Sequence, residues 1–186
     1  QILCKKEFWG YDFYVNKDVL IPRPETEIIV EAVLKYINNN SSKNLLEIGT
    51  GSGCIIISII LERPNTNATA IDISKKALKV ARYNAKMHHL INKIKLINID
   101  IDKFNHNKYD FIISNPPYVN KLDLKYLNKE VVNYEPKLAL DGGLDGLSII
   151  RKVIKKSSEL IKKNGKLILE IAFDQKKMVR NLLIEN

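Results

Sequence analysis

The sequence predicts an α/β fold: a doubly wound, Rossmann-like and mostly parallel sheet, preceded by a small N-terminal β-hairpin. Short segments that are apolar nearly throughout alternate with helical patterns, which is typical of parallel strands buried on both faces. A glycine-rich loop follows the first of these strands and opens a helix, as in the nucleotide-binding folds of this class. The chain of 186 residues has the length of one ordinary domain.

The N-terminal part of the chain has its own pattern. Residues 7–15 are rich in aromatic side chains around a glycine, which predicts a hairpin. Pro22 and Pro24 then indicate an extended connector and the start of a helix, because proline fits the first helical turn. We therefore expect residues 1–24 to form a hairpin and connector, and residues 25–186 to form the main domain.

The main domain alternates between the two kinds of element. A first helix is expected after the connector, with buried positions at helical spacing at Ile29, Val33 and Ile37. Strands are expected at Asn44–Ile48, Ala68–Ile73, Ile94–Ile99, Tyr109–Ser114 and Lys166–Ala172. Further helices are expected at Cys54–Glu62, from Ser74 to His88, at 144–163, and from about Asp174.

The composition, with 45% hydrophobic and 27% charged residues, is that of a globular protein. No apolar run approaches the roughly 20 residues that span a bilayer, and the sequence does not open on the pattern of a secretory leader. Its two cysteines, Cys4 and Cys54, cannot form a disulfide scaffold or a four-ligand zinc site. We therefore expect a cytoplasmic protein with no metal and no membrane partner.

The net charge of +9 comes mainly from lysine, which supplies 25 of the 30 basic residues. The lysines are scattered in pairs rather than gathered in one block, which favours a solvated surface over a nucleic-acid site. The chain also holds 27 isoleucines and 19 asparagines, a bias that an AT-rich coding sequence produces whatever the protein does. An attraction to an acidic partner therefore stays open, and the charge alone decides nothing.

The first candidate site is the loop Leu-Glu-Ile-Gly-Thr-Gly-Ser-Gly at residues 46–53, directly after a strand. Its glycines allow a sharp turn and a close approach by a ligand, and the helix behind it offers free N–H groups. Asp72 ends the next strand, where an acidic side chain meets ribose hydroxyls in such folds. The pattern predicts a nucleoside cofactor.

The choice of cofactor depends on two further residues. Cys54 stands where the dinucleotide fingerprint needs a glycine, and the loop lacks the lysine of a phosphate-binding Walker loop. Glu47 would repel a pyrophosphate but suits a ligand that carries an ammonium and a sulfonium. S-adenosylmethionine is therefore favoured, and the loop resembles the first motif of class I methyltransferases.

The second candidate site is Ser-Asn-Pro-Pro-Tyr-Val at residues 114–119, at the edge where open α/β sheets bind ligands. The prolines restrict the backbone, so the side-chain oxygen of Asn115 and the carbonyl of Pro116 form two rigid acceptors. Two such acceptors suit a planar NH₂ group. The segment is similar to the box of methyltransferases that act on amide or aromatic-amine nitrogen.

A third segment, Val-Leu-Ile-Pro-Arg-Pro-Glu-Thr-Glu at residues 19–27, makes the resemblance specific. In the same order the chain carries Phe8-Trp9-Gly10, this segment, the glycine loop, the Asn-Pro-Pro-Tyr segment, Glu135-Pro136 and Leu-Asp-Gly-Gly-Leu-Asp-Gly at 140–146. The whole resembles the release-factor glutamine methyltransferases, the HemK-type family, over almost its full length. A sister family that methylates a ribosomal-protein glutamine shares two of these motifs but shows Pro-Arg-Ser-Pro in the third segment.

The resemblance implies methyl transfer from S-adenosylmethionine to the side-chain amide nitrogen of the glutamine in the Gly-Gly-Gln loop of peptide chain release factors, which act in translation termination. S-adenosylhomocysteine is the implied product. Implied cofactor-binding residues are Glu47, Gly49, Thr50, Gly51, Gly53, Asp72, Ile73, Asp100, Ile101 and Asn115. Implied catalytic residues, which hold the target glutamine, are Asn115, Pro116 and Tyr118.

Two departures from the family pattern stand out. The family often has an aromatic residue directly after the position of Asp100, where this chain has Ile101. The adenine wall is therefore expected to be aliphatic, or to use Phe104 instead. The family also has an N-terminal helical domain and further strands at the end of the sheet, so we expect this chain to be the catalytic core.

Two other function classes are weighed against this one. A methyltransferase acting on an exocyclic amine of DNA or RNA would use the same Asn-Pro-Pro-Tyr segment and the +9 charge, but no base-recognition domain is visible. A non-catalytic binding module would be expected to lack either Asp72 or that segment, and the chain has both. We expect a monomer that acts on release factors and does not bind nucleic acid directly.

Overall fold

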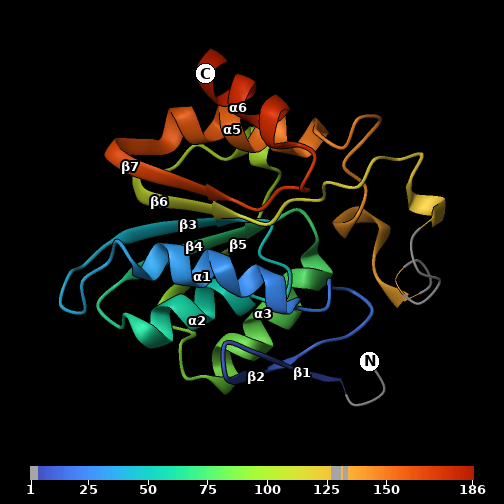
Figure 1. Ribbon diagram of the computed structural model, residues 1–186. Helices are drawn as coiled ribbons and strands as arrows, with labels where there is room; N and C mark the ends of the chain where they lie inside the picture. Colours follow the sequence, from blue (N-terminus) through green and yellow to red (C-terminus); the bar gives the residue numbers. More distant parts are fainter. Residues whose placement is uncertain (1–3, 127–130, 132–133) are drawn as a thin grey trace.

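The computed structural model describes residues 4–126, 131 and 134–186. Its centre is a five-stranded sheet in which every pairing is parallel and the strand order is β5-β4-β3-β6-β7 (Figure 1). The strands are β3 (Asn44–Ile48), β4 (Asn67–Asp72), β5 (Ile94–Asn98), β6 (Tyr109–Ser114) and β7 (Ile161–Leu169). The predicted doubly wound parallel sheet is confirmed.

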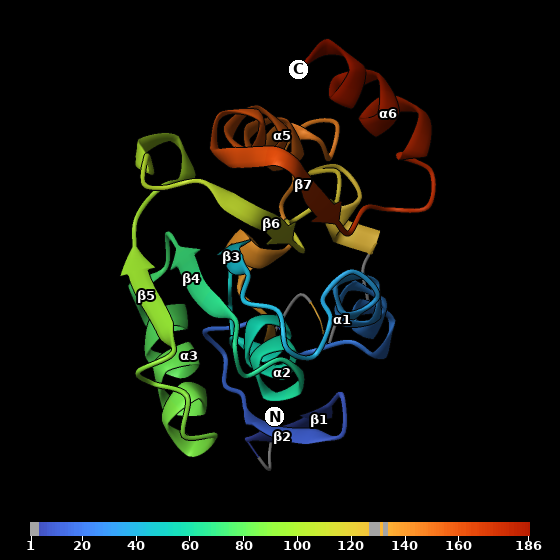
Figure 2. The same cartoon turned by 90° about the vertical axis from the view of Figure 1, so that its left-hand side faces the viewer.

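Helices cover both faces of this sheet (Figure 2). One face carries α1 (Glu27–Leu34), α2 (Cys54–Glu62) and α3 (Lys75–Met87); the other carries α5 (Ser148–Leu160), against which α6 (Lys176–Glu185) packs. Successive side chains of a strand point to opposite faces, so Leu45 belongs to one buried cluster and Leu46 to the other. Burial on both faces explains why the strands read as continuous apolar segments.

The N-terminal hairpin consists of β1 (Lys5–Phe8) and β2 (Tyr11–Tyr14), paired antiparallel. It begins two residues earlier than the sequence predicts, and it lies against α2 and α3 on the side away from the sheet (Figure 2). Phe8 and Phe13 are buried, with their ring centroids 6.2 Å apart in an edge-on arrangement. The hairpin therefore contributes to the core that the first face of the sheet shares with its helices.

Asn84 of α3 joins the hairpin to the glycine loop. Its side chain is fully buried and makes three hydrogen bonds. Its Oδ1 accepts the N–H of Tyr14 at 2.8 Å, while its Nδ2 donates to the carbonyls of Tyr14 at 3.0 Å and of Ser52 at 2.8 Å. One amide thus satisfies backbone groups from two segments that are far apart in the sequence.

Three predicted elements have boundaries that are wrong by three residues or more. The helix expected over 144–163 is shorter at both ends, because Gly146 with φ 72° belongs to the preceding turn and the chain becomes extended at Ile161. The strand expected at Lys166–Ala172 therefore starts earlier and ends at Leu169. Helix α1 ends at Leu34, so Ile37 is buried in the loop that follows rather than on the helix.

In the part of the chain that the structure describes, no helix combines the length and the apolar character needed to cross a membrane.

Candidate active site

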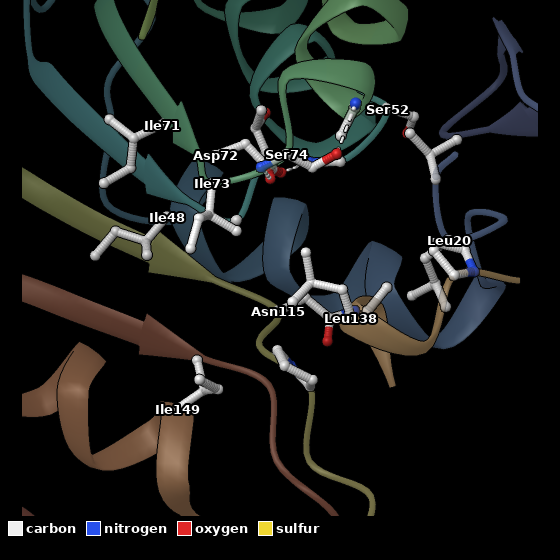
Figure 3. Close-up of a pocket in the computed structure, with 18 of the residues that line it drawn as sticks. Leu20, Ile48, Ser52, Ile71, Asp72, Ile73, Ser74, Asn115, Leu138 and Ile149 are labelled. Atoms are coloured by element: carbon white, nitrogen blue, oxygen red, sulfur yellow. Dashed lines mark hydrogen bonds between the residues drawn. The ribbon is translucent and has the colours of Figure 1, made fainter. Parts of the chain in front are cut away.

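The chemistry-bearing segments meet at one edge of the sheet, because the carboxyl ends of parallel strands share an edge. The glycine loop follows β3, Asp72 ends β4, Asp100 follows β5 and Asn115 follows β6. The chain order reverses at β3, which lies between β4 and β6, and this crossover is where open α/β sheets bind ligands. A cavity of about 280 Å³ opens there, with Asp72 and Ser74 on one side and Asn115 on the other (Figure 3).

The glycine loop is held against β4 by backbone hydrogen bonds. The N–H groups of Gly49 and Thr50 donate to the carbonyl of Ile71 at 2.9 and 3.1 Å. Gly49 and Gly51 have φ of 73° and 55°, and no atom lies within 4 Å of where a Cβ would stand on either. The loop is therefore both fixed in place and open to close approach by a ligand.

Asp72 is the acidic side chain that closes this wall. One carboxylate oxygen accepts the N–H of Gly51 at 2.9 Å and the other accepts the N–H of Ser74 at 2.8 Å. Burial raises the pKa of Asp72, and these two hydrogen bonds oppose that shift. Each oxygen keeps a further lone pair, so the carboxylate is oriented and can still accept hydrogen bonds from a ligand in the cavity.

Glu47 is buried behind the loop and does not line the cavity. It accepts a hydrogen bond from the hydroxyl of Thr50, which does line the cavity. Burial raises the pKa of Glu47 to about 8; the Thr50 hydrogen bond opposes this shift, and the charge of Asp72 adds to it. In this structure Glu47 therefore acts on the cavity through the loop that it supports.

The raised pKa of Glu47 predicts a pH dependence of stability. The unfolded carboxyl ionises near its ordinary pKa of 4.5, whereas the folded one keeps its proton to about pH 8. The folded state therefore binds more protons between these values, and the free energy of unfolding should fall as the pH rises through that interval. We expect Glu47→Gln to flatten this decline in denaturant titrations, and Glu185→Gln, at an exposed position, to leave it unchanged. An identical slope in Glu47→Gln would contradict the assignment.

Asn115 forms the opposite wall. Its Nδ2 donates to the hydroxyl of Thr26 at 3.1 Å, and no described group donates to its Oδ1. Thr26 lies in the short 3-10 helix η1 (Pro24–Thr26), which the residues 19–27 segment forms at the start of α1. The amide oxygen of Asn115 is therefore the acceptor that this wall offers to a ligand.

The segment after Asn115 is fixed from behind by Gln175, which is 4% exposed. Its Nε2 donates to the carbonyls of Tyr118 at 3.1 Å and of Gly146 at 3.2 Å. A Cβ on Gly146 would lie 2.5 Å from the Tyr118 oxygen, so only glycine allows this approach. Pro116 is buried, and Tyr118 is half-buried against the side chains of α5. Burial and the charge of Glu170 raise the pKa of Tyr118.

The connector before α1 contributes cavity wall that sequence reasoning did not anticipate. Its lining residues are Asp18, Val19, Leu20, Pro22, Arg23 and Thr26, and they face Pro136, Leu138 and Ala139 across the opening. Arg23 forms an ion pair with Glu135, whose side chain is 3% exposed. The only signal for this contact in the sequence was that both residues belong to the family pattern.

The wall near Asp100 is aliphatic. It is formed by Ile73, Ile99, Ile101, Ile149 and the stem of Lys152, and none of the described lining residues is aromatic. Phe104 is fully buried beneath this wall, with its ring 6.4 Å from that of Tyr109. Of the two alternatives that the sequence left open, the structure therefore presents the aliphatic side chains to the cavity.

The cavity thus brings together most of the residues that the sequence nominated. Those in its lining are Gly49, Thr50, Gly51, Asp72, Ile73, Asp100, Ile101 and Asn115. Those outside it are Glu47, Gly53, Pro116 and Tyr118. Among the described lining residues the two cationic side chains are already paired, Arg23 with Glu135 and Lys152 with Asp102. The hydrogen bonds that Asp72 and Asp100 accept from the described residues come from backbone N–H groups. The uncompensated charge of the lining is therefore negative.

Comparison with known proteins places this geometry in a family. Residues 25–144 match the family model described as the methyltransferase small domain. The "Bifunctional methyltransferase" of Rickettsia prowazekii (strain Madrid E) is 40% identical over 202 residues, which cover 98% of this chain and 39% of that protein. The "Release factor glutamine methyltransferase" of Clostridium acetobutylicum is 40% identical over 182 residues, which cover 96% of this chain and 64% of that protein. The chain therefore spans less than two thirds of the length of either relative.

Solved structures of methyltransferases have a similar fold. A methyltransferase from Pyrococcus furiosus superimposes with a TM-score of 0.68, covering 95% of this chain and 78% of that one. Its sequence identity of 20% limits this likeness to the fold.

Proposed function

Because this chain belongs to the methyltransferase small domain family, we propose that it transfers a methyl group from S-adenosylmethionine to the side-chain amide nitrogen of a glutamine in a peptide chain release factor. The observation that carries the proposal is the placement of the Asn115 side chain across the cavity from the glycine loop and Asp72. The Nδ2 of Asn115 donates to Thr26, which leaves its amide oxygen as the acceptor. An acceptor for a planar NH₂ group thus faces the wall that suits a nucleoside cofactor. The relatives named release factor glutamine methyltransferases support the choice of substrate.

The lining fits S-adenosylmethionine on three counts. Asp72 has buried, oriented oxygens with lone pairs to spare, which suit the two hydroxyls of a ribose. The isoleucine wall beside Asp100 suits the faces of an adenine ring. The uncompensated negative charge suits a ligand that carries an ammonium and a sulfonium.

The chemistry divides between cofactor and protein. S-adenosylmethionine supplies, when bound, an electrophilic methyl group. The amide nitrogen of a glutamine is a poor nucleophile because its lone pair is delocalised, so the protein must orient it and raise its electron density. Asn115 Oδ1, on the cavity wall, does both by accepting a hydrogen bond from its NH₂ group. The Pro116 carbonyl, which belongs to the next residue and lies outside the lining in this structure, would be the second acceptor once the glutamine is bound. No general base has to act first, because the nitrogen loses its proton readily once it carries positive charge.

Methyl transfer from labelled S-adenosylmethionine tests the proposal directly. The chain is incubated with a release factor, with the same factor in which asparagine replaces the glutamine of its Gly-Gly-Gln loop, and with duplex DNA. We expect label only on the unaltered release factor. Label on the DNA would instead support an exocyclic-amine methyltransferase, and equal label on both release factors would place the acceptor elsewhere.

Replacement of Asp72 tests the cofactor wall. Asp72→Ala should weaken S-adenosylmethionine binding by about 1–3 kcal/mol, or roughly 5- to 150-fold, because two hydroxyls lose a charged acceptor. Calorimetric titration measures the loss, and Asp123→Ala, at an exposed position outside the cavity lining, is the matched control. An unchanged affinity in Asp72→Ala would remove this carboxylate from the site.

A further inference from the structure

Glu170 is a partly buried acidic residue next to Asn115 that has no part in the methyl transfer described so far. It follows β7 directly, and its backbone N–H donates to the carbonyl of Ser114 at 3.0 Å, which places it beside the first residue after β6. Its Oε2 atom is buried and has no hydrogen-bond partner among the described residues. A buried acceptor without a donor costs free energy, so its presence calls for a compensating role.

Three side chains face the Glu170 carboxylate. Burial raises the pKa of Glu170 and the charge of Glu25 adds to the rise, while the polar side chains of Thr26, Asn115 and Tyr118 beside the carboxylate lower it. Thr26 comes from η1 and the other two from the segment after β6. The carboxylate therefore ties the connector to the substrate wall of the cavity.

The hydrogen bonds in this group have a fixed direction. An ionised carboxylate can only accept, so a Thr26 hydroxyl that bonds to Glu170 must donate its single proton there. The Thr26 oxygen is then left as an acceptor, and it receives the N–H of Asn115 Nδ2 at 3.1 Å. Asn115 also lowers the pKa of Glu170, so this carboxylate is the acceptor on offer for the second proton of the Asn115 NH₂ group.

This direction decides which end of the Asn115 amide faces the cavity. The oxygen and nitrogen of an asparagine amide have nearly the same shape, so only the hydrogen-bond network distinguishes the two orientations. A hydroxyl alone does not distinguish them, because it can donate or accept. If the amide turned over, it would present donors to a substrate NH₂ group, which needs acceptors.

We propose that Glu170, acting partly through Thr26, is a positioning residue that fixes the orientation of the Asn115 amide so that its oxygen faces the substrate. The inference rests on the proposed function for the identity of that substrate, but the orientation itself belongs to the protein alone. Glu170→Gln should disturb it, because the new amide keeps the shape of the side chain and adds a donor. Thr26→Val should also disturb it, because the hydroxyl is lost, whereas Thr26→Ser should preserve it.

Kinetics and nuclear magnetic resonance together test the proposal. We expect kcat for methylation of the release factor to fall by about tenfold or more in Glu170→Gln and Thr26→Val, with KM and cofactor affinity within about threefold of the original protein. Thr26→Ser should restore most of the rate, and Glu185→Gln, at an exposed position, should have no effect. A loss of folding would instead lower the active fraction, which circular dichroism measures on the same samples.

The spectroscopic arm does not depend on the substrate. The side-chain amide protons of Asn115 are identified as the pair that disappears in Asn115→Asp, and they should shift in Glu170→Gln and Thr26→Val but not in Glu185→Gln. Unshifted protons, or shifted protons with an unchanged kcat, would overturn the proposal. If the original protein fails to methylate a release factor, the proposed function is wrong, and the amide protons alone decide on the positioning role.

Discussion

Asn115→Ala should lower the rate of methyl transfer to a release factor by about 30- to 1000-fold, and it should change the affinity for S-adenosylmethionine by less than about threefold. One acceptor aimed at the charge that develops on the nitrogen contributes about 2–4 kcal/mol to such a transition state. The Asn115 side chain lies across the cavity from Asp72 and the glycine loop, so its removal should spare the cofactor wall. Single-turnover methylation and calorimetric titration on the same preparations measure both quantities.

Asn115→Asp is the informative companion variant. It keeps an acceptor oxygen but adds a charge, and the desolvation of that charge under a bound substrate is costly. It also replaces the NH₂ group that donates to Thr26 with a second acceptor. We expect an activity between that of the original protein and that of Asn115→Ala. If Asn115→Ala lost cofactor affinity and rate to the same extent, its role would be to shape the cofactor pocket, and the substrate role would have to be withdrawn.

Phe104→Ala should destabilise the fold by about 3–5 kcal/mol while leaving the cofactor site of the folded molecules intact. Its ring is fully buried and packs near Tyr109 and His106, with centroid distances of 6.4 and 5.5 Å, so truncation leaves a cavity in the core. Denaturant titration measures the loss. Phe104→Leu, which removes less volume, keeps enough folded protein to measure S-adenosylmethionine affinity, and we expect that affinity to be unchanged.

For Ile101→Ala we expect the reverse of the result for the Phe104 variants. Ile101 lines the cavity and is only partly buried, so we expect a small loss of stability and a loss of about 1 kcal/mol in cofactor affinity from apolar contact. Together, Phe104→Leu and Ile101→Ala distinguish an adenine wall made of isoleucine side chains from one that uses the Phe104 ring. A loss of affinity in Phe104→Leu with none in Ile101→Ala would show that the adenine wall uses the phenylalanine.

The sequence predicts the sheet well because strands buried on both faces leave a strong signal. Asn44–Ile48 and Tyr109–Ser114 are found with the predicted bounds, since the polar or glycine-rich residues around them stop the strands locally. The end of the last strand is harder to predict. The chain passes from α5 into β7 at Ile161 with no loop between them, and an irregularity in the pairing with β6 between Tyr109 and Phe111 accommodates the extra residues. That irregularity depends on the neighbouring strand, which no local pattern reveals.

The candidate site, like the sheet, can be predicted only in part from the sequence. The positions of Gly49, Asp72 and Asn115 follow from the rule that parallel strands end at a common edge, so the sequence places them correctly at the cavity. The ion pair between Arg23 and Glu135 joins residues 112 positions apart, and nothing in either local sequence indicates the partner. The depth of Glu47 is equally hidden, because the alternation of a strand fixes the face of a side chain but not the thickness of protein above it.

The buried amide of Asn84 has a consequence for the local unfolding of the molecule. It holds the backbone of Tyr14 on the hairpin and the carbonyl of Ser52 in the glycine loop at the same time. If either segment leaves, the buried Asn84 amide is left with an unpaired polar group, so the local unfolding of one segment is coupled to that of the other. The N-terminal hairpin, which carries none of the nominated catalytic residues, therefore helps to set how often the ligand loop opens.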